Sequence, residues 1–168
     1  MFQKAIIILC LLLMSQFTKA QTGWVKQKFG DKLTIGFPAE VKKVNETTYI
    51  AKDSTGTVYG VVIVEMDKSN YLQASATDSL LAKLKFIDMV VGSIKTKMPK
   101  YAIGDVKISE INEVKTYSLA GLNEENKASV YINIFLVDDI SYSLTCFVPA
   151  NANPKNKAVF MQNFSIAK

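Results

Sequence analysis

Two adjacent acidic pairs are the strongest candidates for chemistry in this chain, Glu124-Glu125 and Asp138-Asp139. Two carboxyl groups can serve as acid and base in a glycosidase when they converge across a cleft, or can hold calcium together with backbone carbonyls. Neither pair has the alternate-residue spacing of a calcium loop. Adjacent acids are more often solvated turn residues, so we interpret both pairs as turns and keep a carboxylate-based hydrolase as the alternative function.

Other catalytic groups are scarce. The sequence contains no histidine, which excludes Ser-His-Asp and Cys-His nucleophiles and imidazole metal sites. Cys146 falls on the apolar face of an alternating strand, which predicts a buried and unreactive thiol. Ser79 and Lys83 are four residues apart, but we interpret them as a solvated helix face rather than a Ser-Lys dyad. We therefore predict a non-enzyme, with no catalytic residue, no cofactor and no metal site.

Residues 1–20 have the pattern of a secretory signal peptide. Lys4 precedes an apolar run at 5–14, and Thr18-Lys19-Ala20 supplies small residues for cleavage. The apolar run is short for a membrane span, and no second such run occurs. We predict cleavage before Gln21, a mature domain at 21–168, a periplasmic or extracellular location, and no stable membrane insertion after cleavage.

The charge pattern disfavours nucleic acid as a partner. All 20 basic residues are lysine, and they are scattered rather than clustered. Removal of Lys4 and Lys19 leaves 18 lysines against 15 acids, a net charge of +3. Arginine, the usual fork for phosphates and guanine edges, is absent.

The segment 75–98 predicts a long helix that must position the other elements. Its apolar residues recur at alternating steps of four and three, and they are Leu80, Leu84, Ile87, Val91, Ile94 and Met98. Pro99 then ends the helix. A helix with so long an apolar stripe needs a sheet beneath it.

Alternating patterns predict strands on both sides of this helix, at 24–29, 33–37, 41–51, 58–66, 103–112, 114–122, 128–137 and 140–148. Asp138-Asp139 predicts a tight hairpin between the last two. Residues 58–66 are apolar at both alternations, which is typical of a strand covered on both faces. Pro154 can open a final short helix that uses Val159, Phe160 and Phe164 as its apolar contacts.

This order predicts a single α+β domain. We expect a mostly antiparallel sheet of about six to eight strands, one long central helix and a short C-terminal helix. Strand order, register and oligomeric state stay open at this point.

Three pieces of the chain resemble the PsbP-like α/β/α sandwich family of small exported proteins. They are Leu33-Thr34-Ile35-Gly36-Phe37-Pro38, the helix between two antiparallel halves, and the closing segment from Ala158 to Ile166. The resemblance implies the fold across most of the mature chain. It carries over no catalytic residue set, and the metal-binding members use histidine, which this chain lacks.

One face of the sheet is the predicted site of function. If Ile140, Leu144 and Cys146 point at the long helix, Phe147 points away from it. Four aromatic residues would then share that second face, namely Tyr59, Tyr131, Phe135 and Phe147. Either the C-terminal helix covers this apolar face, which is the interpretation we favour, or part of it forms a groove. We predict an exported binding or accessory domain whose partner, still unidentified, is a protein or an apolar small ligand.

Overall fold

The computed structural model describes residues 23–65, 79–153 and 155–167. The predicted signal peptide at 1–20 lies outside the described residues, so its cleavage before Gln21 stays a prediction. Within the described ranges, no helix is both long and apolar enough to cross a membrane.

Within the described residues, the larger of two sheets has eight strands, all of them antiparallel to their neighbours. They are β3 (Lys42–Lys43), β4 (Thr48–Lys52), β5 (Val58–Glu65), β6 (Tyr101–Ile103), β7 (Lys107–Ile111), β8 (Val114–Asn123), β9 (Ser129–Val137) and β10 (Ile140–Val148). Their order is β3-β4-β5-β10-β9-β8-β6, and β7 also pairs with β8. The α+β class with a mostly antiparallel sheet is therefore confirmed.

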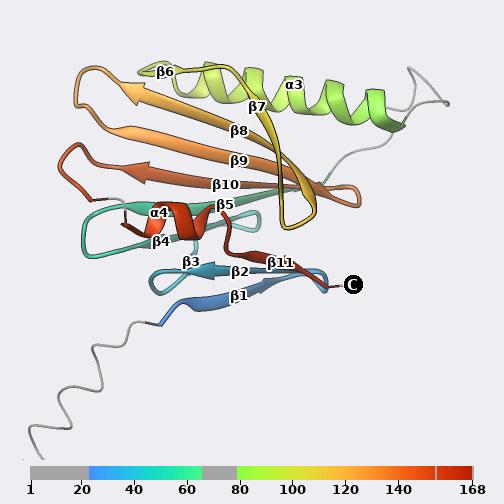
Figure 1. Ribbon diagram of the computed structural model, residues 1–168, viewed down its shortest axis with the longest axis horizontal. Coiled ribbons are helices and arrows are strands. Elements are labelled where there is room, and N and C mark those ends of the chain that lie inside the picture. Colours follow the sequence, from blue (N-terminus) through green and yellow to red (C-terminus); the bar gives the residue numbers. More distant parts are fainter. Residues whose placement is uncertain (1–22, 66–78, 154, 168) are drawn as a thin grey trace, which may run out of the picture.

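A second sheet, of three strands, packs against one face of the larger sheet. It has the order β1-β2-β11, built from β1 (Val25–Phe29), β2 (Leu33–Phe37) and β11 (Phe164–Ile166). Figure 1 shows this sheet at one side of the larger sheet and the long helix α3 (Ser79–Lys97) at the opposite side. The short helix α4 (Lys155–Phe160) lies between β10 and β11 in the chain.

Several predicted elements need correction. The single strand expected at 41–51 is the hairpin of β3 and β4. The strand expected at 103–112 is confined to β7, and β6 is a separate strand that ends at Ile103. Phe164 begins strand β11 instead of extending the last helix, because Phe164 and Ile166 pair with Ile35 and Leu33 of β2. The Asp138-Asp139 hairpin is confirmed, and Asp138 adopts the left-handed conformation (φ 54°) that such tight turns require.

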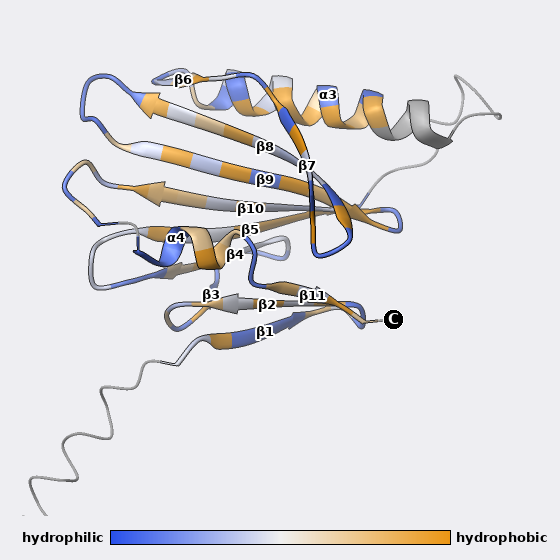
Figure 2. Ribbon diagram, in the orientation of Figure 1, coloured by the Kyte–Doolittle hydropathy of each residue, from blue (hydrophilic) through white to orange (hydrophobic). Residues whose placement is uncertain are grey.

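Two hydrophobic cores lie on opposite faces of the larger sheet. The first core joins one face of β5, β9 and β10 to the second sheet and to Phe160 of α4. The second core joins Phe86, Ile87 and Val91 of α3 to β8 and β9. Figure 2 shows the corresponding concentration of hydrophobic residues in the strands, whereas the connection between β8 and β9 is hydrophilic.

The long helix is present but is not central. Its buried partners are Tyr117 and Leu119 of β8, together with Val130, Ile132 and Ile134 of β9. Phe86, absent from the predicted stripe, is among its most buried side chains. The side of α3 that faces β5 and β10 is less closely packed, and the candidate site lies there.

Candidate functional site

Strand β5 divides its side chains between a closed face and an open one. Tyr59 and Val61 are fully buried in the first core. The alternate residues point to the other face of the sheet, where Val58 and Val62 are half-buried and Val64 is 44% exposed. An apolar strand that is covered on only one face leaves apolar surface in contact with water.

A groove of about 480 Å³ lies between this open face and α3. We call it the apolar groove. Its floor includes Val58, Gly60, Val62 and Val64 of β5, Ile50 of β4 and Phe147 of β10. Its wall is a row on α3 formed by Phe86, Met89, Val90, Ile94, Lys97 and Met98. These positions recur at steps of three and four, so they share one side of the helix.

Gly60 leaves space in the floor of the groove. A Cβ atom built on Gly60 would meet no atom nearer than 3.8 Å, the backbone oxygen of Tyr49. Packing within the described fold therefore does not require glycine here. Glycine inside a strand weakens it, and it often marks a place where a ligand approaches the backbone closely.

A second hollow, of about 560 Å³, lies on the opposite face, beside α4 and over β8 and β9. We call it the polar hollow, and its polar lining includes Asp105, Lys107, Ser118, Tyr131, Asn133 and Lys157.

Hydrogen bonds within the fold already satisfy the polar groups at the base of this hollow. Ser118 Oγ donates to Asn133 Oδ1 at 2.7 Å, and Asn133 Nδ2 donates to the Met161 carbonyl at 3.1 Å. Lys157 Nζ lies 3.9 Å from the centroid of the Tyr131 ring, in a cation–π contact. The polar hollow can therefore remain hydrated without a ligand.

The four aromatic residues predicted to share one face do not form one surface. Tyr59 and Phe135 are fully buried in the first core. Tyr131 lines the polar hollow, and Phe147 lines the apolar groove on the opposite face. The prediction that Phe147 shares a face with the other three aromatic residues was wrong. Ile140, Leu144 and Cys146 point toward the second sheet and not toward α3, so Phe147 points toward α3.

The C-terminal helix helps to cover the face of the larger sheet that carries Tyr59 and Phe135, which is the interpretation that we favoured from the sequence. The ring of Phe160 lies 5.1 Å from that of Tyr59, and the ring of Phe164 stacks 4.4 Å from that of Phe135. Val159 was expected to take part, yet it is 48% exposed. The second sheet supplies most of the remaining cover, which the sequence did not predict.

Asp53 and the hydroxyl of Tyr59 form a polar contact at the edge of the first core. The hydroxyl donates to Asp53 Oδ2 at 2.7 Å. Burial and the neighbouring carboxylate raise the pKa of Tyr59 well above its usual range. Burial alone would raise the pKa of Asp53, but hydrogen bonds from Thr55, Tyr59 and Thr57 hold it below its usual value. The contact is structural, because neither side chain lines the groove or the hollow.

The Cys146 side chain is fully buried in the first core. Burial is the main cause that raises the pKa of its thiol to about 12. The thiolate is the reactive form, so Cys146 is suited to packing and not to nucleophilic attack. The prediction that it is buried is confirmed, although it packs toward the second sheet rather than toward the long helix.

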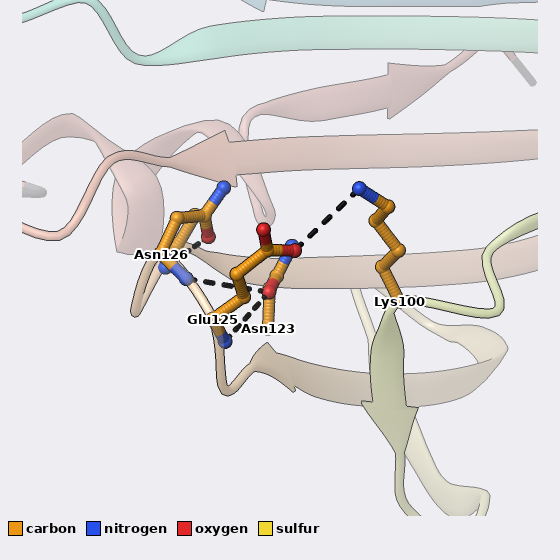
Figure 3. A network of polar contacts seen from close by, with 5 residues as sticks. Lys100, Asn123, Glu125 and Asn126 are labelled. Atoms are coloured by element: carbon orange, nitrogen blue, oxygen red, sulfur yellow. Dashed lines mark hydrogen bonds and ion pairs between the residues drawn. The ribbon is translucent and has the colours of Figure 1, made fainter.

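The acidic pairs lie in exposed turns. Glu124 pairs with Lys127 at 2.7 Å, and Lys100 reaches Glu125 at 3.5 Å. Figure 3 shows the latter pair beside Asn123, whose side-chain oxygen accepts hydrogen bonds from the backbone of Glu125 and Asn126. These contacts organise the turn between β8 and β9.

The Asp138-Asp139 pair is also placed away from the groove. Asp138 forms an ion pair with Lys32, and neither it nor Asp139 lines the groove or the hollow. The side chains of Ser79 and Lys83 lie outside the described ones. Among the described residues, no group of three or more acidic or cysteine side chains is close enough to hold a metal ion.

The groove residues that sequence reasoning missed had a visible signal. Val58, Val62 and Val64 form the second apolar alternation of β5, and Phe86, Val90 and Ile94 form an apolar row on α3. The sequence could not show that these two rows face each other across a gap, because that depends on which strands α3 covers.

The search of family models found no match, and no curated protein matched the sequence. Among the solved structures that match, two with TM-scores above 0.5 share the fold at low identity. The solution structure of cyanobacterial PsbP (CyanoP) from Synechocystis sp. PCC 6803 has a TM-score of 0.58 at 9% identity, over 87% of this chain and 94% of that one. A protein from Bacteroides thetaiotaomicron has a TM-score of 0.53 at 11% identity, over 88% of this chain.

This chain spans only 50% of the Bacteroides protein. A Pseudomonas aeruginosa protein of unknown function has a TM-score of 0.46 at 7% identity, over 83% of this chain and 92% of that one. The likeness to the cyanobacterial protein confirms the PsbP-like fold that the sequence predicted. It shows the fold alone and names no ligand for this chain.

Proposed function

We propose that this chain is an exported, non-enzymatic binding domain, periplasmic or extracellular, that holds an apolar ligand or an apolar segment of a partner in the apolar groove. The observation that carries this proposal is the groove itself, in which Val64 is 44% and Met89 51% exposed. Its volume of about 480 Å³ is within the range of roughly 300–1,000 Å³ typical of small-molecule sites. Contiguous exposed apolar side chains are costly, and they mark interaction sites more often than bare surface.

The lining of the groove supports binding rather than catalysis. Its described residues provide hydroxyl groups, from Thr48, Ser93, Ser143 and Thr145, and one ammonium group, from Lys97. Acid–base catalysis by paired carboxylates would need acidic side chains that converge on the ligand. The described lining of the apolar groove contains no carboxylate. Asp105 lines the polar hollow on the opposite face of the sheet.

A neutral fluorescent probe tests the proposal. We would titrate the protein with N-phenyl-1-naphthylamine, whose emission rises in apolar surroundings, and we expect saturable binding. Gly60→Val should abolish the signal while leaving the fold intact, because a Cβ at this position meets only ordinary contacts, the nearest at 3.8 Å, and the side chain points into the groove. Gly104→Val is the matched control, because Gly104 lines the polar hollow and a Cβ there also meets only ordinary contacts, the nearest at 3.6 Å.

Two results would contradict the proposal. A folded Gly60→Val variant that binds the probe like the native protein would show that the groove is not the site. Robust turnover in a panel of glycoside and ester substrates, abolished by Asp105→Asn, would favour the hydrolase instead.

A further inference from the structure

We propose that the occupant of the apolar groove is a single long-chain carboxylate, held with its alkyl chain along β5 and its head group at Lys97. This inference rests on the proposed function and names the ligand class for the same site. Three features of the groove lead to it: its length, the position of the one charged residue among its described lining residues, and the small number of hydrogen-bonding groups in that described lining.

The groove is long. From Val58 to Val64 the floor extends about 20 Å along β5, at roughly 3.3 Å per residue. From Phe86 to Met98 the wall extends about 18 Å along α3, at 1.5 Å per residue. The groove is therefore long enough to hold one extended alkyl chain along its length.

The two ends of the groove differ in charge. Lys97 lies at the end near Phe147 and Val58, because Tyr101, four residues after Lys97, has its ring 6.2 Å from that of Phe147. At the other end, around Val64 and Phe86, the described lining carries no charged side chain. An anionic head group is therefore attracted to the Lys97 end.

Lys97 is well suited to this role. It is the charged residue of the groove lining, and among the described residues no carboxylate forms an ion pair with it. The C-terminus of α3 carries a partial negative charge of roughly half an elementary charge, which Lys95 and Lys97 together outweigh. An ammonium group donates up to three hydrogen bonds, which is enough to bind a carboxylate.

An alkyl chain also fits the groove better than an extended peptide does. Each peptide unit brings an N–H and a C=O group that need partners once they leave water. The nearest candidate strand, β4, pairs with β5 along its length and with β3 at Tyr49 and Ile50, so it offers little free edge to a peptide strand. The described lining of the groove has scattered hydroxyl groups to satisfy such a backbone, whereas an alkyl chain needs none.

The experiment compares hexadecanoic acid with hexadecanol, by displacement of N-phenyl-1-naphthylamine from the protein. The acid should bind at least about tenfold more tightly than the alcohol, as expected for a hydrogen bond to a charged group. Lys97→Met should remove this difference, because it weakens binding of the acid much more than binding of the alcohol. Lys95→Met is the control, because Lys95 is exposed on the same helix and outside the groove lining, and it should retain the preference for the acid.

Chain length provides an independent readout. Affinity should rise about fourfold for each methylene group added to a shorter acid, and stop rising once the chain fills the groove. A response of this kind that disappears in Gly60→Val would support the alkyl chain lying along β5.

The outcomes separate this inference from the function on which it rests. Equal affinities for acid and alcohol, with binding of both lost in Gly60→Val, would overturn the role of Lys97 and leave the apolar site standing. If neither displaces a probe that does bind in the groove, the single-chain ligand is wrong and a protein segment becomes the occupant. If the probe itself does not bind, both proposals fail.

Discussion

The two faces of β5 and β10 differ in how completely they are covered. On one face, Val61 and Leu144 are fully buried beneath the second sheet and α4. On the other, Val62 and Phe147, each next to a buried residue in the chain, line the apolar groove. The difference comes from the covering elements, because both faces of these strands carry apolar side chains.

Simple dimensions explain why one face stays open. A helix with its side chains is about 10–12 Å wide, and strands in a sheet lie about 4.8 Å apart. One helix therefore covers about two strands, and α3 covers β8 and β9. On the other face, a three-stranded sheet and α4 together cover a wider area. Among the described elements, a single helix over so wide a sheet leaves the apolar strands beside it without a second cover.

The largest expected effect comes from opening the closed face. Phe160 is fully buried between Phe37 and Tyr59, so Phe160→Ala should cost about 3–5 kcal/mol of unfolding free energy. Thermal unfolding would then occur roughly 10 °C lower, which calorimetry can measure. Val159→Ala is the control, because Val159 is 48% exposed and the change should cost less than about 0.5 kcal/mol. Equal losses in the two variants would mean that α4 does not close this face.

A pair of neighbours on β5 compares the two faces directly. Val61→Thr replaces a methyl group with a hydroxyl at a fully buried position, which should cost about 1–3 kcal/mol when the hydroxyl lacks a partner. Val62→Thr makes the same change on the groove side, where water can reach the hydroxyl, and should cost less than about 0.5 kcal/mol. Urea denaturation of both variants measures the difference. Similar costs would show that the groove side is as closed as the other.

The sequence predicted strands β5 and β10, but it did not predict which elements cover each of their two faces. The sequence predicted that Tyr131 and Phe135 of β9 share one face, and both do pack in the first core, whereas the alternate residues Val130, Ile132 and Ile134 pack in the second. It could not determine which group meets α3, because that requires the register and order of strands far apart in the chain. The aromatic residues Tyr59 and Phe147 were therefore wrongly assigned to one face.

The cover itself was hidden for a different reason. Strand β11 has only three residues, Phe164–Ile166, and exists because it pairs with β2, which is more than 100 residues earlier. Short segments of this kind carry no periodic signal. The groove is a consequence of what α3 leaves uncovered, so no local pattern in the sequence marks it.

A smaller effect is expected at the contact that holds the covering sheet in place. Asn112, in the turn between β7 and β8, donates hydrogen bonds from Nδ2 to the carbonyls of Gln162 and Phe164, each at 2.8 Å. Asn112→Gly keeps the left-handed backbone (φ 52°) but loses both bonds, and should cost about 1–2 kcal/mol. Urea denaturation checks the value. An unchanged free energy of unfolding would mean that this turn does not secure β11.

The smallest effect concerns the edge of the closed face and its dependence on pH. Asp53 accepts hydrogen bonds from Thr55, Thr57 and the Tyr59 hydroxyl, and its pKa is held below the usual value of about 3.9. A lowered pKa means that the folded state binds the proton more weakly than the unfolded state. The stabilisation is therefore fully present above about pH 4 and is lost as the pH falls through the folded-state pKa.

Asp53→Asn tests this dependence, because the amide cannot ionise. At about pH 7 the native protein should have a higher melting temperature than the variant. This difference in melting temperature should become smaller as the pH falls below about 4. Tyr59→Phe removes one of the hydrogen bonds that lower the pKa of Asp53. The difference in melting temperature between this variant and the native protein should therefore also become smaller at acidic pH. Phe160→Ala is the control, because its loss of melting temperature relative to the native protein should not depend on the titration of Asp53. A gap between the native protein and Asp53→Asn that stays constant from neutral to acidic pH would show that the Asp53 carboxylate does not stabilise the closed face.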